Sequence, residues 1–420
     1  MPSLRTDLAL LRHRRFALLT AARTVSVTGN GFGAVALAFG VLALPGASPT
    51  RLSIVQASLA LPQLLVLVGG VIADRVPRAR LMVIAELLAG LGYAELAALI
   101  LLGHAPTVAL AVLAALAGLG TALFAPAYAG LLPEVVRADQ LHAANGLQRL
   151  GVNAGQVLGF GLSGVAVVLI GPGWTLAINA GSFLVSAVLL GSLRVPPVSR
   201  PGGNPVRELR EGWREFRSRQ WLWVIVVQFS LLVGALEAYV GVLGPMAARQ
   251  WMGGAPAWSA VLVAQMAGNL LGVLVAIRVR PRRPMLVATL ATLTFAPPLL
   301  ILGLHWPLVA ILAAVFVSGV GIDIFGVLWS VTLQREVPAT VISRVSSWDH
   351  FGSLALAPLG LAVAGPIAMV AGVGPTLLGG AALIVVATLA ALCAPEVRRL
   401  RAPTDAPIAA APTEDVVRPG

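Results

Sequence analysis

The stretch GGVIADRVPRAR, at residues 69–80, lies between two long apolar runs and combines one carboxylate, Asp74, with three arginines. It is too short to form a domain. Pro77 stops a helix there, because proline lacks a backbone N–H group and clashes with the preceding turn. Short arginine-rich loops between membrane spans stay on the cytoplasmic side. The stretch therefore predicts a cytoplasmic loop between two membrane-spanning helices.

The composition of the whole chain agrees with this prediction. Of its 420 residues, 58% are hydrophobic and only 11% are charged, whereas soluble domains have about 25% charged residues. Apolar runs of about 20 residues, the length of a membrane-spanning helix, recur from end to end. We therefore expect an all-α integral membrane protein.

The net charge of +12 could indicate nucleic-acid binding, but the position of the arginines argues for orientation in a membrane instead. The chain has no lysine, so all 29 basic residues are arginine. In the predicted topology 26 of these 29 lie in cytoplasmic loops, tails or helix ends; Arg51 and Arg249 lie outside, and Arg23 lies in the first span. This bias places both termini in the cytoplasm and predicts no nucleic-acid partner. Abundant Ala, Gly and Arg without Lys are typical of a high-GC bacterium, so we expect a bacterial inner membrane.

The apolar runs predict twelve membrane-spanning helices joined by short turns. The predicted spans are residues 17–44, 53–73, 81–102, 106–128, 143–169, 174–193, 221–245, 257–278, 285–303, 307–330, 346–368 and 374–394.

A weak internal repeat divides these spans into two sets of six. The motif at residues 70–80 aligns with residues 272–282 at an offset of 202, close to half the chain length, although Ala276 replaces Asp74 in the second copy. Such offsets are typical of parallel six-helix repeats. The predicted parts are an N-terminal half at 1–193, a cytoplasmic linker at 194–220, a C-terminal half at 221–401 and a disordered tail at 402–420.

The linker contains a predicted amphipathic helix. Val206, Leu209, Trp213 and Phe216 share one helical face, and the opposite face carries Arg and Glu. We expect this helix to lie in the membrane surface and to join the two halves. A partner-binding helix is the alternative interpretation.

The motif Gly-x-x-x-Asp-Arg-x-x-Arg-x-Arg at residues 70–80 resembles the loop between helices 2 and 3 of major facilitator superfamily transporters. With Pro77 in place of a second Gly, it is most similar to the branch that holds macrolide-efflux proteins and the enterobactin exporter. FAPAYAGLLPEV at residues 124–135 and WSVTLQREVP at residues 329–338 resemble the helix 4–5 and helix 10–11 junctions of that branch. The resemblance covers nearly the whole chain and implies the twelve-helix major facilitator fold.

In this superfamily the loop acts as a conformational latch whose Asp and Arg groups bond across to the other half of the protein. The resemblance assigns that role here to Gly70, Asp74, Arg75, Arg78 and Arg80. The expected partners are Arg344 and Asp349, with Asp349 at the start of helix 11, where free N–H groups and the helix dipole would attract Asp74. A basic loop that only sets orientation is the alternative.

Two positions depart from the resemblance. Asn30 stands where the branch often has Asp. Residues 155–164 keep the glycines of helix 5 of many antiporters but lack their proline. The missing proline leaves import open as an alternative to export.

Carboxylates within the spans are candidates for proton coupling, because a charge at the bilayer centre costs about 3 kcal/mol or more unless it meets water or a partner. The resemblance implies that helices 1, 4, 7 and 10 line a central cavity. Glu237 in helix 7 and Asp323 in helix 10 are therefore the proton-coupling candidates. The alternative for each is a structural bond to a neighbouring helix.

Helix 3 carries two further carboxylates. Glu86 and Glu95 are nine residues apart, so they point to opposite faces and cannot form one site. Glu86 is predicted near the inner surface, where it could join a latch network with Arg75 or Arg78.

Three other polar residues are cavity or substrate candidates: Arg23, Asn30 and Gln228. For Arg23 the alternative is a side chain that extends to the inner interface. For the two amides the alternative is hydrogen bonding between helices.

Missing motifs exclude other classes of protein. The chain has neither a His-Glu-x-x-His metal motif nor a nucleophile motif, and without lysine it has no phosphate-binding Gly-x-x-x-x-Gly-Lys loop. Cys393 is the only cysteine, so no intrachain disulfide can form. We therefore expect no enzymatic activity, no cofactor and no metal site.

The resemblance implies secondary active transport by alternating access. We expect a monomer in membrane lipid that exports a drug-like or siderophore-like small molecule in exchange for protons. A proton-coupled importer of a small nutrient is the alternative. A non-transporting sensor or scaffold is a further alternative, although the longest soluble segment is the linker at 194–220.

Overall fold

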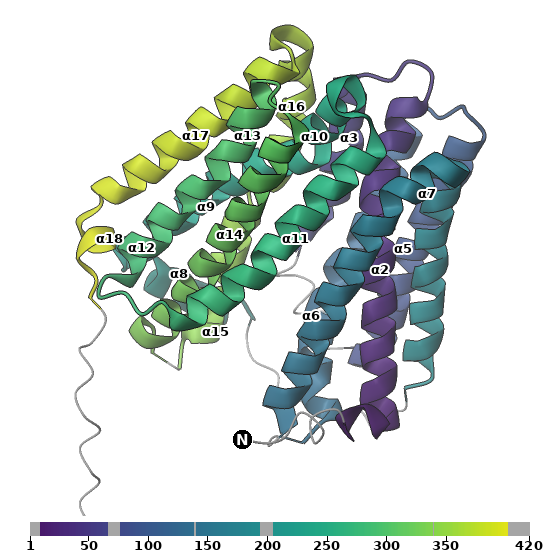
Figure 1. Cartoon of the computed structure of the whole chain (residues 1–420). Helices are drawn as coiled ribbons and strands as arrows, with labels where there is room; N and C mark the ends of the chain where they lie inside the picture. The colour runs from purple at the N-terminus through teal and green to yellow at the C-terminus, as the bar shows by residue number, and fades with distance from the viewer. Residues whose placement is uncertain (1–8, 66–75, 138–139, 194–204, 339, 402–420) are drawn as a thin grey trace, which may run out of the picture.

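The computed structural model describes residues 9–65, 76–137, 140–193, 205–338 and 340–401. These residues form helices and turns, and no strand occurs among them (Figure 1). Ten helices of this described part are long and apolar enough to cross a membrane. The prediction of an all-α multi-pass membrane protein is therefore confirmed.

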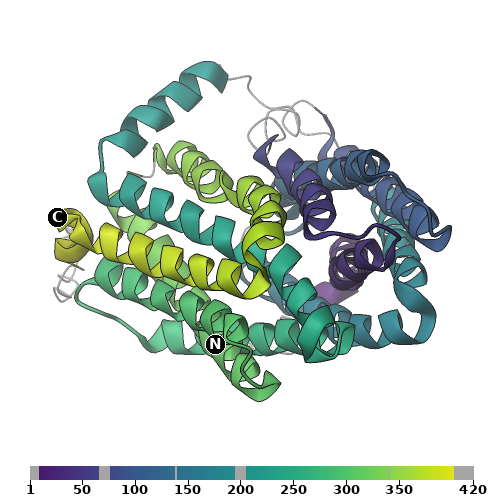
Figure 2. The same cartoon turned by 90° about the horizontal axis from the view of Figure 1, so that it is seen from above.

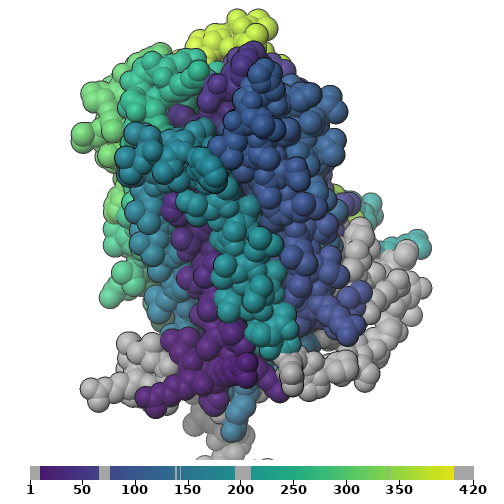
Figure 3. All heavy atoms as spheres, turned by 90° about the vertical axis from the view of Figure 1, so that its right-hand side faces the viewer, coloured from purple at the N-terminus to yellow at the C-terminus, as the bar shows by residue number. Residues whose placement is uncertain are grey.

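The helices before residue 194 pack into one group, called here the first bundle (Figures 1 and 2). Within it α5 packs against α6 and α7, and α2 packs along α7. Figure 3 shows this bundle from the side, with the purple start of α2 at the lower end. Its elements are η1 Ala9–Arg12, α2 Arg14–Ala43, α3 Pro49–Ala60, η2 Leu61–Leu65, α5 Arg78–Leu101, α6 Thr107–Val135 and α7 Leu141–Gly191.

The helices after residue 219 form the second bundle, in which α11 packs on α14 and α13 packs on α17. Its elements are α9 Gln220–Ala238, η4 Tyr239–Leu243, α10 Gly244–Ala247, η5 Ala248–Met252, α11 Ala255–Arg278, α12 Pro284–Ala291, η6 Thr292–Phe295, α13 Ala296–Gly303, α14 Leu308–Glu336, α15 Ile342–Leu354, α16 Ala357–Ala371, α17 Val373–Cys393 and α18 Pro395–Arg399.

Similar glycine turns reverse or bend the chain in both bundles. Gly171 interrupts α7 with φ 83° and ψ 161°, and Gly372 separates α16 from α17 with φ 89° and ψ 160°. These positive φ values favour glycine, which has no Cβ to clash with the backbone. The breaks in the helices at Gly171 and Gly372 therefore have a local backbone cause.

Two helices extend well beyond their predicted spans. α6 continues to Val135 and α14 continues to Glu336, although the apolar runs were predicted to end at residues 128 and 330. Hydropathy detects the apolar part of a helix, whereas backbone hydrogen bonding continues into its polar last turns. On α6 those turns carry Glu134, which forms an ion pair with Arg78.

The two bundles meet closely at one end, called here the distal end, which lies opposite to the end where α2 begins and α17 ends (the terminal end). At the distal end α3 packs against α16. The backbone N–H of Gly365 donates to Ser53 Oγ at 2.6 Å, and Gln56 Nε2 donates to the carbonyl of Gly241 at 3.0 Å. Arg249 also donates to the carbonyl of Leu42. These bonds join the bundles there.

The buried side chains show the same asymmetry between the two ends. One hydrophobic core contains residues of both bundles, among them Leu37, Leu52, Tyr239 and Leu361. Two smaller cores each belong to a single bundle: one contains Phe16 and its neighbours, and the other lies around Leu222. The first bundle and the second bundle therefore share a core distally and have separate cores elsewhere.

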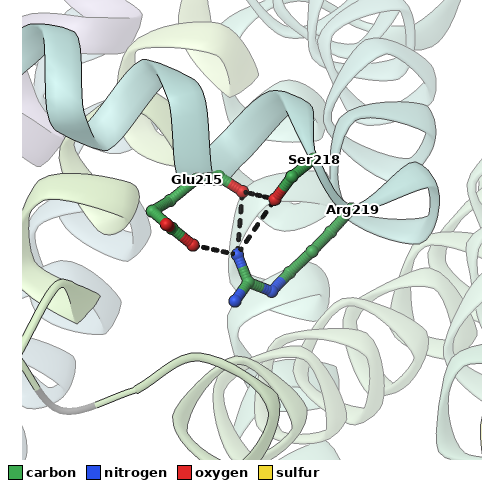
Figure 4. A network of polar contacts seen from close by, with 3 residues as sticks. All are labelled: Glu215, Ser218 and Arg219. Carbon is green, nitrogen blue, oxygen red and sulfur yellow. Dashed lines mark hydrogen bonds and ion pairs between the residues drawn. The ribbon is translucent and has the colours of Figure 1, made fainter.

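The linker helix α8, Pro205–Arg217, packs against α15. The Trp213 ring lies 4.9 Å from that of Trp348, and Arg344 Nη1 lies 2.7 Å from Glu211 Oε2. Figure 4 shows how the turn into α9 is held: Arg219 Nη1 bonds to Glu215 Oε2 at 2.9 Å and to its backbone carbonyl at 2.8 Å. The predicted amphipathic helix thus exists and contacts the second bundle.

Candidate functional site

A cavity of about 230 Å³ lies among α2, α5 and α6 and is called here the first cavity. Its wall combines small and aromatic residues with a similar number of polar or charged ones. Leu354 and His350 of α15 reach it from the second bundle. The polar groups that line it include Arg23, Ser26, Asn30, Gln63, Glu86 and Thr121.

Arg23 enters this cavity from α2. Its guanidinium carbon lies 5.2 Å from the ring centroid of Phe124 and 5.3 Å from that of Tyr128, both on α6. Such cation–π contacts stabilise an arginine that has left water. The Nε atom is buried without a hydrogen-bond partner. Arg23 is thus half-buried against the rings of α6, and both its role with substrate and the alternative of an interfacial side chain stay predictions.

Glu86 of α5 lines the same cavity, and its side chain is only 1% exposed. Ser26 Oγ donates to its Oε2 at 3.3 Å, while its Oε1 has no partner. Arg23 is close enough to attract it electrostatically. Glu95, on the same helix, is exposed, as its spacing from Glu86 predicts.

A second cavity, of about 260 Å³, lies between α7 of the first bundle and α11 and α14 of the second. Asp323 lines it, and Arg149 across the bundle boundary attracts this carboxylate. The amides Asn153, Gln156 and Asn269 also line it. Asp323 therefore lies in a different cavity from Arg23 and Glu86.

Glu237 does not line either of these cavities. Its side chain on α9 is exposed in the structure. The proton-coupling roles of Asp323 and Glu237 stay predictions.

Gln228 differs from the other cavity candidates. It is 3% exposed and donates to Thr292 Oγ1 at 2.9 Å and to Thr388 Oγ1 at 3.2 Å. These bonds join α9 to η6 and α17 inside the second bundle. Asn30, by contrast, lines the first cavity. Asn30 and Arg23 therefore line the same cavity, whereas Gln228 lies between helices of the second bundle.

The predicted latch is only partly within the described residues, because Gly70, Asp74 and Arg75 lie outside them. Arg80 is exposed at the start of α5. Arg78 Nη1 lies 3.0 Å from Glu134 Oε1 and also donates to the carbonyl of Gly130. These contacts of Arg78 join α5 to α6 within the first bundle, so the partner that the structure gives Arg78 is Glu134 and not Glu86.

The expected latch partners on the other half are placed differently from the prediction. Helix α15 begins at Ile342, so the expectation that Asp349 begins this helix was wrong. Asp349 Oδ2 accepts a bond of 3.0 Å from Trp329 Nε1. Arg344, expected before the helix, lies inside it and pairs with Glu211 of the linker. Hydropathy detects only the apolar part of a helix, so it did not detect the polar first turn of α15.

Sequence reasoning missed that Glu86 and Arg23 share one cavity. Both were visible as charges within predicted spans, but their common position depends on how α2 packs against α5 and α6. It also missed Tyr128 as a ring contact of Arg23 and Arg149 as a neighbour of Asp323, because both are contributed by other helices.

Comparison with known proteins gives consistent matches. A family model described as "Transmembrane secretion effector" matches residues 5–416. The multidrug efflux pump Tap of Mycolicibacterium fortuitum is 31% identical over 419 residues, which cover 92% of this chain and 95% of that protein. The enterobactin exporter EntS of Citrobacter koseri is 28% identical over 349 residues, 81% of this chain and 82% of that protein.

A solved structure shows the same fold at low sequence identity. A point variant of the nucleoside transporter NupG superposes with a TM-score of 0.76 over 90% of this chain and 99% of its own, at 13% identity. At that identity the likeness concerns the fold alone.

Proposed function

The chain belongs to the transmembrane secretion effector family of major facilitator transporters, and we propose that it exports a drug-like or siderophore-like small molecule in exchange for protons. The two bundles would move relative to each other so that a site between them opens to one side of the membrane at a time. As part of this proposal, the chain has twelve spans in two sets of six.

Two features support a count of twelve rather than the ten long helices of the described residues. The backbone of α7 is interrupted at Gly171, so α7 would hold two spans, and α3 with η2 would begin another span, predicted at residues 53–73. The matching turns at Gly171 and Gly372, each before the last span of its bundle, support a repeat.

The single observation that carries the proposal is the asymmetric contact between the bundles. They share a core and hydrogen bonds at the distal end, while the cores around Phe16 and Leu222 are separate. A molecule joined at one end can open at the other by moving two intact units. The arginine-rich loops predicted from the sequence lie at the terminal end, which supports a cytoplasmic position for that end. In the described state the site between the bundles would then open to the cytoplasm.

The first cavity supports an amphipathic substrate. Its wall is divided between small or apolar side chains and polar or charged ones, which can orient a ligand through hydrogen bonds. The relatives named above, a multidrug efflux pump and an enterobactin exporter, support the same class. Proton coupling would use Asp323, Glu237 or both.

The proposal is tested in everted membrane vesicles that carry a pH-sensitive dye. Ethidium, a set of lipophilic antibiotics and enterobactin are added one at a time after a proton gradient is imposed. A compound that dissipates the gradient only in vesicles containing the protein establishes proton-coupled export. If none does so while the protein is verified as folded, uptake into whole cells tests the importer alternative.

A further inference from the structure

Glu86 and Arg23 are incompletely partnered polar groups inside the first cavity. Glu86 accepts a bond from Ser26 at 3.3 Å and faces the hydroxyl of Ser186 on α7, but its Oε1 has no partner in hydrogen-bond geometry. The Nε of Arg23 is also buried without a partner. Within the described part of the chain no ion pair joins the two groups, although they attract each other. The two side chains thus leave polar atoms unsatisfied in the same cavity.

Burying a carboxyl group costs free energy unless the group is protonated, fully hydrogen-bonded or ion-paired. Two arrangements remove that cost here. Glu86 can carry a proton while Arg23 stays on the rings of Phe124 and Tyr128, as in the structure. Alternatively, Arg23 can leave the rings and pair with ionised Glu86. Because both residues line one cavity, rotation of the long arginine side chain can interconvert these arrangements.

We infer that Glu86 and Arg23 form a proton-exchange pair whose two arrangements alternate during transport. This inference rests on the proposed proton-coupled export and adds a carboxylate of the first bundle to those proposed in the second. A proton from water on the distal side forms an O–H bond with Glu86. That bond breaks when the proton passes to water on the terminal side, and Arg23 then neutralises the carboxylate.

The surroundings of Glu86 link this exchange to the position of the bundles. Among the described residues, Arg23 on α2 and His350 on α15 line the cavity and can carry charge, and Tyr128 on α6 contacts Arg23. Helix α7 contributes the uncharged Phe183 and the hydroxyl of Ser186 beside Glu86. Because α15 belongs to the second bundle, relative movement of the bundles shifts His350 against Glu86 and changes the access of water to this carboxyl group. Movement of the bundles therefore controls which side supplies or receives the proton.

The exchange also controls the wall that a substrate would meet. When Arg23 lies on the rings of Phe124 and Tyr128, it covers aromatic surface. When Arg23 pairs with Glu86, that surface is free to contact an aromatic or cationic substrate. Protonation and substrate binding would then exclude each other, which is what exchange in opposite directions requires.

The test needs no substrate, so it is independent of the proposed export. Asn145→Cys on α7 and Gln334→Cys on α14 place spin labels at exposed terminal ends of the two bundles, in a Cys393→Ser background. The distance distribution between the labels is measured in lipid nanodiscs from acidic to alkaline pH. Glu86→Gln is compared with Glu95→Gln, the same substitution at an exposed position of the same helix.

The expected result is a pH-dependent distribution in the parent protein and in Glu95→Gln, and a distribution that no longer responds to pH in Glu86→Gln. A Glu86→Gln protein with the same pH response as the parent would overturn the inference. A parent protein without any pH response would overturn it too.

A second variant keeps the test valid if Glu86→Gln does not fold. Arg23→Gln removes the counter-ion, so the midpoint of the pH response should move to higher pH by about one unit or more. An unchanged midpoint in folded Arg23→Gln would contradict the pair. Failure of wild-type export in vesicles, with the pH response intact, would count against the proposed function and not against this pair.

Discussion

The backbone N–H of Gly365 in α16 donates a hydrogen bond of 2.6 Å to Ser53 Oγ in α3, and so joins the two bundles at the distal end. A Cβ atom built on Gly365 would lie 2.2 Å from the carbonyl oxygen of Pro49, closer than two such atoms can approach. The distal contact therefore depends on the absence of a side chain at this position.

Gly365→Leu should prevent close distal contact, at a cost of about 1–3 kcal/mol for the closed arrangement. A cysteine introduced at Pro49 should then react faster with a membrane-impermeant thiol reagent applied from the distal side. Gly379→Ala in α17 is the matched control, because a Cβ there meets no other atom within 4 Å. Equal labelling rates in Gly365→Leu and the parent would show that this contact does not close the distal end.

The ion pair between Arg78 and Glu134 should stabilise the first bundle, because both side chains are about five-sixths buried, at 16% and 15% exposed. Each single change, Arg78→Gln or Glu134→Gln, should lower the melting temperature. The free energy lost should be roughly 2 kcal/mol, between the values for exposed and buried pairs. The double variant should lose less free energy of unfolding than the two single variants lose together. Additive losses in such a cycle would mean that the pair does not act as a unit.

Asp74→Asn should impair transport while the protein still inserts into the membrane, if the loop at residues 69–80 acts as a latch. The charge of Asp74 would be the group attracted to the other half, and the amide keeps its size. Turnover is compared with the amount of protein in the membrane. Normal turnover in Asp74→Asn would leave the loop with orientation as its only role.

Asp323→Asn and Glu237→Gln should each weaken proton-driven transport if these carboxylates carry protons. Both substitutions keep the shape of the side chain and remove its ability to ionise. Accumulation driven by a proton gradient is measured beside substrate exchange without a gradient, which a folded variant should retain. Full proton-driven transport in both variants would exclude the two residues as carriers.

Trp213→Ala should loosen the linker helix from α15, because it removes ring contacts with Phe216 and Trp348. Aromatic pairs of this kind contribute about 0.5–1.5 kcal/mol each beyond area burial. Amide hydrogen exchange across residues 210–217 should accelerate. Arg344→Gln should have a smaller effect, because its pair with Glu211 is about one-third exposed. If hydrogen exchange is unchanged in Trp213→Ala, contacts other than these rings hold α8 against α15.

Several features of the fold could be predicted from the sequence because they depend on local chemistry. Apolar runs of sufficient length predicted the spans, and the short gaps between the runs predicted where the chain reverses. The periodicity of Val206, Leu209, Trp213 and Phe216 predicted the linker helix. Errors occurred at helix ends, as at α15, because hydropathy does not detect polar helical turns.

The candidate site was less predictable, because its residues belong to different helices. Glu237, Asp323 and Glu86 were recognisable as charges in spans, but hydropathy is the same whichever neighbour a carboxylate faces. Asn30 was expected to line a cavity or to bond between helices, and its place in the first cavity depends on helix rotation. Gln228 has the same chemistry and lies between helices instead.

The sequence by itself determined the class of protein, the number of apolar segments and the bias of arginine that sets orientation, because each depends on composition along the chain. Only the tertiary structure decided that Arg23 lies on the rings of Phe124 and Tyr128 beside Glu86, and that Arg78 pairs with Glu134. Those neighbours come from helices far apart in the chain. Their meeting depends on the rotation and packing of whole helices, which no single segment encodes.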